Sequence, residues 1–194
     1  MKNRSILTAA ALVLAACQST SVQTYSSPEE ATRAIVAAAE AGDGVEASRI
    51  FDTFARSSVQ RDRAFAELFD AGVSRYEDGR YRAAADVFSF VCERYPRAVN
   101  AKECLVYALL LQRSTSETAE PGLIAELDGA VAAARAASQA PAVWVDLAAA
   151  QVAIDANDLA RAREDFAAFL GAWGGEPAAL MIYVEDLGRR LGAD

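Results

Sequence analysis

The segment from Phe65 to Pro96 constrains the fold of this chain more than any other. Apolar residues recur at helical spacing on both sides of Gly79. Proline cannot continue a helix, so Pro96 ends the second stretch. Two helices that are joined by a short turn lie antiparallel against each other. The segment therefore predicts a helical hairpin.

Gly72 lies inside the first of these two helices, where glycine costs about 1 kcal/mol relative to alanine. A close approach of the second helix at Ala84 would compensate for this cost, because two small residues let the backbones come together. Phe88 would then cover the apolar gap. The alternative is that Gly72 ends a short helix, but Arg75 and Tyr76 continue the helical pattern beyond it.

The same intervals recur elsewhere in the chain. An alanine follows the turn residue after five positions, and a phenylalanine follows it after nine. The three instances are Gly42, Ala47 and Phe51; Gly79, Ala84 and Phe88; and Asn157, Ala162 and Phe166. Asparagine tolerates the left-handed backbone conformation that a helix-ending glycine adopts, so Asn157 suits this position.

The spacing of Gly79, Ala84, Phe88 and Pro96 resembles a tetratricopeptide repeat (TPR), a helix–turn–helix unit of about 34 residues. The resemblance implies an all-α fold over residues 28–191. We expect a TPR-like right-handed α-solenoid of about four helix hairpins, with a C-terminal capping helix over 177–191. The third hairpin, in 98–138, is the poorest match. Its register stays open, and the candidate small packing positions are Ala130, Val131 and Ala134.

The composition excludes several kinds of function. The chain has no histidine, which removes histidine bases, histidine-dependent nucleophile triads and histidine metal ligands. Its net charge of −8 repels phosphate backbones, so we expect no nucleic-acid partner. Adjacent acidic residues such as Glu164 and Asp165 point to different sides of a helix and are expected to be solvated. We expect no cofactor, no metal site and no small-molecule substrate.

Residues 1–17 have the pattern of a bacterial lipoprotein signal peptide. Lys2 and Arg4 precede an apolar run over 6–16 that is too short to span a bilayer as a helix. The run ends in Leu14-Ala15-Ala16-Cys17, which resembles a lipobox. The resemblance implies cleavage after residue 16 and attachment of a diacylglycerol and an N-acyl chain to Cys17. Several chains anchor a protein stably, whereas one chain binds only marginally.

The residues after Cys17 predict the location of the mature protein. Residues 17–27 are expected to form the lipidated cysteine and a flexible, polar tether. In familiar sorting rules an Asp after the cysteine retains a lipoprotein at the inner membrane. Gln18 therefore favours a lipid anchor in the periplasmic face of the outer membrane. Without Lys2 and Arg4 the net charge changes from −8 to −10.

In the TPR family one face of each first helix lines a concave groove that binds a partner segment. The matching residues here are Phe69, Val73, Tyr76, Glu77, Trp144, Leu147 and Gln151. Aromatic and apolar residues of this kind anchor partner segments. The alternative is that apolar residues at this spacing fill the core. The polar tips of Tyr76 and Trp144 favour a wet edge.

Cys92 and Cys104 lie at equal sequence distances from a turn near residue 98. Antiparallel helices joined at this turn would place the two thiols at the same height. The periplasm is oxidising, so a disulfide between them is possible. The alternative is two buried free cysteines.

These features predict a membrane-tethered, non-enzymatic adaptor that binds a protein partner in the cell envelope. TPR lipoproteins act in outer-membrane, pilus or secretion, and cell-wall machinery, and this chain is similar to them in plan. One alternative is an envelope hydrolase or glycan-active enzyme with a carboxylate pair in the groove. Another is a self-assembling structural protein.

Overall fold

The computed structural model describes residues 25–116, 118, 120–176 and 178–192. Its helices are α1 (Pro28–Glu40), α2 (Gly44–Phe54), α3 (Ser58–Glu77), α4 (Tyr81–Arg94), α5 (Val99–Thr115), α6 (Pro121–Ala137), α7 (Trp144–Asp155), α8 (Leu159–Ala172) and α9 (Met181–Leu191), with a 3₁₀ helix at Ala178–Leu180. The described residues contain no β-strand, which confirms the expected all-α class.

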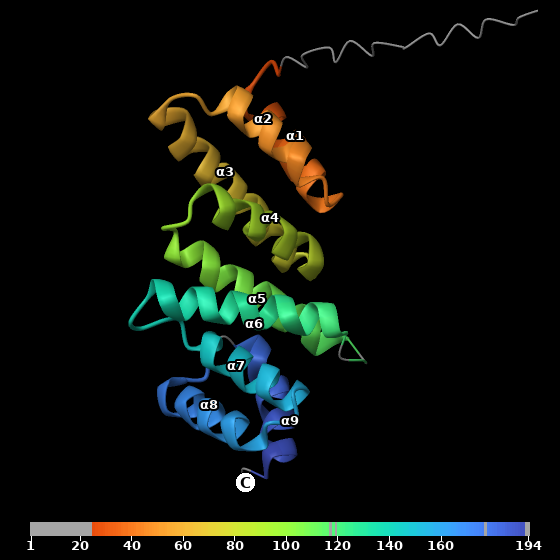
Figure 1. The fold of residues 1–194 in the computed structure, drawn as a ribbon, viewed down its shortest axis with the longest axis vertical. Helices are drawn as coiled ribbons and strands as arrows, with labels where there is room; N and C mark the ends of the chain where they lie inside the picture. The colour runs from red at the N-terminus through yellow and green to blue at the C-terminus, as the bar shows by residue number, and fades with distance from the viewer. Residues whose placement is uncertain (1–24, 117, 119, 177, 193–194) are drawn as a thin grey trace, which may run out of the picture.

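Successive helices pack in pairs that follow one another along the long axis of the molecule (Figure 1). α1 packs on α2, α3 on α4, α5 on α6, and α7 on α8. Neighbouring pairs are joined by contacts of α4 with α5 and of α6 with α7, while α1 also contacts α3 and α5 contacts α7. The core has two adjoining parts, and Phe69 packs against both of them.

Three turns between paired helices have the same geometry. Their turn residues have a positive φ, of 74° at Gly42, 73° at Gly79 and 58° at Asn157. The next residue donates its N–H to the carbonyl five positions earlier: Asp43 to Ala38 at 2.9 Å, Arg80 to Arg75 at 2.8 Å, and Asp158 to Ala153 at 2.8 Å. This is the hydrogen bond of a Schellman turn. The expectation that Asn157 adopts the left-handed conformation is confirmed.

The alanine and phenylalanine that follow these turn residues are buried on α2, α4 and α8. Their exposed fractions are 0% for Ala47, Ala84 and Ala162, and 4%, 0% and 3% for Phe51, Phe88 and Phe166. The recurring intervals therefore mark equivalent buried positions on three second helices.

Gly72 lies within α3 and is buried, so the alternative in which it ends a short helix is wrong. The ring of Phe88, which was expected to cover the gap beside Gly72, is the group nearest to this position. A Cβ added at Gly72 would lie 2.7 Å from both Cε1 and Cζ of Phe88. Phe88 is fully buried, so its ring has little room to move.

We expect Gly72→Ala to destabilise the protein by about 1 kcal/mol, although alanine favours helices. Overpacking a core costs about 1–3 kcal/mol, and the better helix propensity returns about 1 kcal/mol. Urea unfolding measures the change. The matched control is Gly129→Ala in α6, where an added Cβ meets nothing within 4 Å and alanine should stabilise by about 0.5–1 kcal/mol. Equal effects at the two sites would contradict this account.

Several helix boundaries differ from the sequence-based expectation. α3 begins at Ser58 and not near Phe65, because Ser57 and Gln60 form a complete capping box at its N-terminus. Ser27 caps α1 by accepting the N–H of Glu30, while the carboxylate of Glu30 accepts the N–H of Ser26 at 2.8 Å. In the poorly matched third hairpin, Ala130, Val131 and Ala134 are buried on α6.

The expected signal peptide and the lipidation site at Cys17 lie outside the described residues. Three residues of the expected tether contact the helical part: Tyr25 packs against the core, Ser26 bonds to Glu30, and Ser27 caps α1. In the described part of the chain, no helix combines the length and the apolar character needed to cross a membrane.

Candidate partner-binding face

α3, α5 and α7 each contribute one aromatic ring to a continuous row. The ring centroids of Tyr76 and Tyr107 lie 5.7 Å apart with the planes at 83°. Those of Tyr107 and Trp144 lie 5.4 Å apart with the planes at 52°. All three side chains are partly buried and pack against the core. The row thus connects three helices that are first in their pairs.

These rings surround a cavity of about 380 Å³, which we call the aromatic hollow. Its lining residues are Tyr76, Cys104, Tyr107, Trp144 and Glu176. The indole N–H of Trp144 donates to the carbonyl of Glu103 at 2.9 Å, and the Glu103 carboxylate accepts the N–H of Ala142 at 2.8 Å. These bonds hold the start of α7 on α5 and so orient the indole.

The electrostatic character of the aromatic hollow is acidic and apolar. Glu176 contributes a carboxylate to its lining, and Glu77 is exposed next to Tyr76 at the end of α3. Among its described lining residues there is no basic side chain. Burial raises the pKa of the Tyr107 phenol, so this ring stays neutral at physiological pH.

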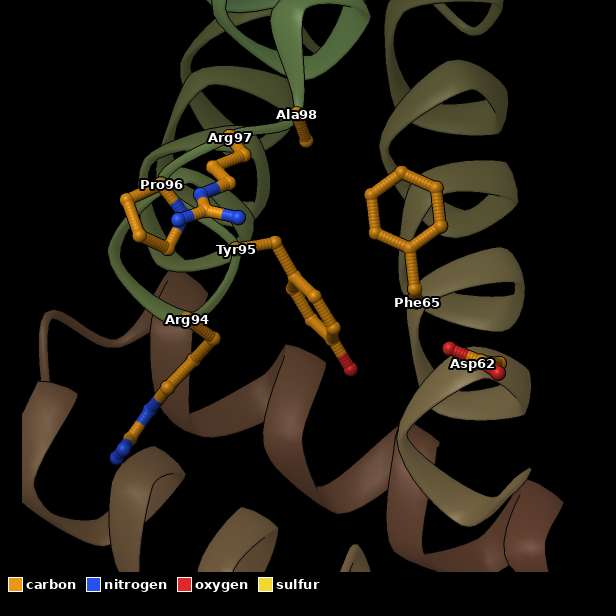
Figure 2. A pocket seen from close by; sticks show the side chains of 7 residues that line it. All are labelled: Asp62, Phe65, Arg94, Tyr95, Pro96, Arg97 and Ala98. Carbon is orange, nitrogen blue, oxygen red and sulfur yellow. The ribbon is translucent and has the colours of Figure 1, made fainter. Parts of the chain in front are cut away.

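A second cavity, of about 490 Å³, lies between α3 and the turn from α4 to α5 (Figure 2). Phe65 and Tyr95 extend toward it from opposite sides, with ring centroids 5.0 Å apart, while Arg94 points away. The Tyr95 hydroxyl donates to the carbonyl of Arg61, and burial raises its pKa to about 12. Arg94 lies over the ring of Phe51, with its Cζ 5.2 Å from the centroid.

The structure separates the expected groove residues into open and buried ones. Tyr76 and Trp144 line the aromatic hollow, and Glu77, the next residue after Tyr76, is exposed. Phe69 and Val73 are half-buried, and Phe69 makes an edge contact with Phe88.

Two of the residues that were expected to line the groove are buried instead. Leu147 is 0% exposed and Gln151 is 1% exposed, so neither can contact a partner on this surface. The cause at Gln151 is α9, whose Tyr183 hydroxyl donates to the Gln151 side-chain carbonyl.

Tyr107 was missed because the register of the third hairpin was open. The available signal was that Tyr107 is the one aromatic residue of α5, as Trp144 is of α7. The expectation of solvation also fails at Asp165, which is 9% exposed and accepts from Arg135 at 2.7 Å. The same guanidinium donates to Asp146 at 2.7 Å and thereby links α6 to α7 and α8.

Within the described residues, no cluster of three or more potential metal ligands occurs.

Cys92 on α4 and Cys104 on α5 are both free thiols in this structure, so the possible disulfide between them is not formed here. Both side chains are partly buried. Burial raises the pKa of each thiol from 9.0 to about 11. Since the thiolate is the reactive form, these cysteines should be poor nucleophiles at neutral pH.

We expect the native protein to react slowly with iodoacetamide at both cysteines. The raised pKa reduces the thiolate fraction near pH 8 about 100-fold relative to the unfolded chain. The native rate should keep rising up to about pH 11, while the rate in urea should level off near pH 9. Mass spectrometry of the peptides that contain the two cysteines measures both rates. Native rates that match those in urea would contradict the assigned burial.

No protein-family model matches this chain, and no curated protein matches it in sequence.

Proposed function

We propose that this chain is a lipid-anchored scaffold of the cell envelope, with a TPR-like right-handed solenoid that holds a protein partner on the face of α3, α5 and α7. The single observation that carries this proposal is the row of Tyr76, Tyr107 and Trp144, with one ring from each of three first helices. Partly exposed aromatic residues that surround a cavity are typical anchor sites for partner segments.

The solenoid part of the proposal is supported by the three equivalent turns and by the buried positions that follow them. A chain of stacked helix pairs presents its first helices side by side and so offers an extended binding face. α9 would serve as the cap, because it covers Gln151 at the end of the face and keeps Arg189 and Arg190 exposed.

The envelope location is supported by the lipobox-like residues that end at Cys17. In cells fed a palmitate analogue, the protein should be labelled and should sediment with outer membranes. Cys17→Ser should abolish the labelling and release the protein from the outer-membrane fraction, because serine offers no thiol for the diacylglycerol. Labelling that persists in Cys17→Ser would overturn the anchor.

The partner-binding face can be tested by photo-crosslinking in cells. Benzoylphenylalanine at Glu77, which is exposed and follows Tyr76 in α3, should give a specific adduct with an envelope protein. The matched control is Glu164, which is exposed on α8. Tyr107→Leu keeps an apolar side chain but removes the ring, and it should abolish the adduct at Glu77 while circular dichroism shows an intact helical fold. Equal adducts at both positions, or an adduct that is insensitive to Tyr107→Leu, would overturn the assignment.

A self-assembling structural protein is a second candidate, because apolar side chains are exposed at the C-terminal end. Ile182 on α9 is 81% exposed and Met181 is 44% exposed. Sedimentation would distinguish the two hypotheses. The scaffold should be monomeric, whereas a self-assembling protein should form oligomers that dissociate when Ile182 is replaced by aspartate.

A further inference from the structure

We propose that the aromatic hollow recognises a guanidinium group, presented by an arginine of the partner segment. The inference rests on the proposed function and deepens it by naming the group that is bound. The faces of aromatic rings carry negative electrostatic potential and attract organic cations within about 6 Å of the ring centroid. Tyr76, Tyr107 and Trp144 meet at 83° and 52°, so their planes form walls and not a flat stack.

The charge of the aromatic hollow favours a cation. Glu176 places a carboxylate in the lining next to the rings. Its Oε2 accepts the N–H of Ala178 at 3.1 Å, and its carbonyl accepts the indole N–H of Trp173 at 3.0 Å, so the backbone and the carboxylate are both held. Glu77, which follows Tyr76 in the chain, is exposed and adds negative charge at this end of α3. A bound cation would thus meet aromatic rings and the Glu176 carboxylate together.

The arginines of the chain that are nearest in sequence to these rings are engaged elsewhere. Arg75 precedes Tyr76 and donates to Glu40 at 2.6 Å. Arg113 lies on α5, as Tyr107 does, and forms a two-pronged pair with Asp155 at 2.8 and 2.9 Å. Neither arginine lines the aromatic hollow, and this leaves its acidic lining for a group from outside.

The chemistry of the lining selects guanidinium over an apolar side chain and over ammonium. An apolar anchor would remove water from the Glu176 carboxylate without pairing it, which is unfavourable. Guanidinium is planar, stacks on aromatic faces, is more weakly hydrated than ammonium and can donate two parallel hydrogen bonds to one carboxylate. The volume of about 380 Å³ lies within the range of ligand pockets, about 300–1,000 Å³, so the aromatic hollow has room for a guanidinium and for part of the segment that carries it.

The test compares N-acetyl-arginine methylamide with its citrulline counterpart, which has the same shape but no charge. The chain has two tryptophans, so its indole N–H groups give two signals in ¹H–¹⁵N NMR spectra, and Trp144→Phe assigns them. We expect the arginine compound, added up to tens of millimolar, to shift the Trp144 signal. It should bind about 10-fold more tightly than the citrulline compound.

Two variants and one comparison make the test decisive. Glu176→Gln should weaken arginine binding and leave citrulline binding unchanged, while Tyr107→Leu should remove the Trp144 shift for arginine. Equal binding of the two compounds, or no shift with either, would overturn guanidinium recognition. The photo-crosslink at Glu77 is independent of both compounds. An intact crosslink together with equal binding therefore leaves the proposed scaffold in place and removes only the arginine assignment.

Discussion

Replacement of Phe88 by alanine should lower the free energy of unfolding by about 3–5 kcal/mol, because it removes a large side chain from a closely packed core. Phe88 is 0% exposed, and its ring fills the space next to Gly72. The ring also makes an edge contact with Phe69, with the two ring centroids 5.5 Å apart. The matched control is Phe65→Ala, because Phe65 is only half-buried at the cavity of Figure 2. Urea unfolding of both variants should show the smaller loss at Phe65.

The pairing of Phe88 with Gly72 also predicts a change of sign. In the wild-type protein Gly72→Ala should be destabilising, because its Cβ would lie 2.7 Å from the Phe88 ring. In the Phe88→Ala background that ring is gone, and Gly72→Ala should become stabilising through helix propensity. A double-mutant cycle measures this coupling, which we expect to be about 1–3 kcal/mol. Additive effects would show that Gly72 does not make room for Phe88.

Replacement of Asp155 by alanine should cost about 3–5 kcal/mol, because it leaves the Arg113 guanidinium buried without its partner. The side chains of Arg113 and Asp155 are 12% and 4% exposed, and two hydrogen bonds join them. The bond to Asp155 and its negative charge raise the pKa of Arg113, so the guanidinium cannot escape the cost by losing a proton. Urea unfolding measures the loss.

A surface pair supplies the control for this prediction. Asp186→Ala breaks the contact between Asp186 and Arg189, whose side chains are 51% and 74% exposed, respectively. It should change the free energy of unfolding by less than about 1 kcal/mol. The double variant Arg113→Met with Asp155→Leu should recover most of the loss, because it removes both charges together. A small loss in Asp155→Ala would show that water reaches Arg113.

The Arg113–Asp155 pair also concerns the binding face, since it joins α5 to α7. These helices carry Tyr107 and Trp144, whose rings form part of the aromatic hollow. If Asp155→Ala remains folded at low temperature, the Trp144 indole signal should broaden or move, because α7 loses one of its fixed contacts with α5. An unchanged Trp144 signal would show that the loss of stability is local to the ion pair, whereas a changed signal would show that the binding face is altered as well.

Short-range sequence chemistry was sufficient to predict the all-α class and most of the hairpins. Glycine or asparagine at the turns and proline at position 96 act within a few residues of their own position. The buried alanine and phenylalanine after each turn followed from spacing alone. The start of α3 was misjudged because the capping box of Ser57 and Gln60 was overlooked, although it too is local.

Only the packing of distant segments decided which helix faces are open. Tyr76, Leu147 and Gln151 were all assigned to one groove, yet Leu147 lies in the core and Gln151 lies beneath α9. Tyr107 entered the site because α5 contacts α7, a contact that no local signal specifies. The physical reason is that helical periodicity gives the phase of a side chain around its own axis, while its exposure depends on every other helix that packs against that side.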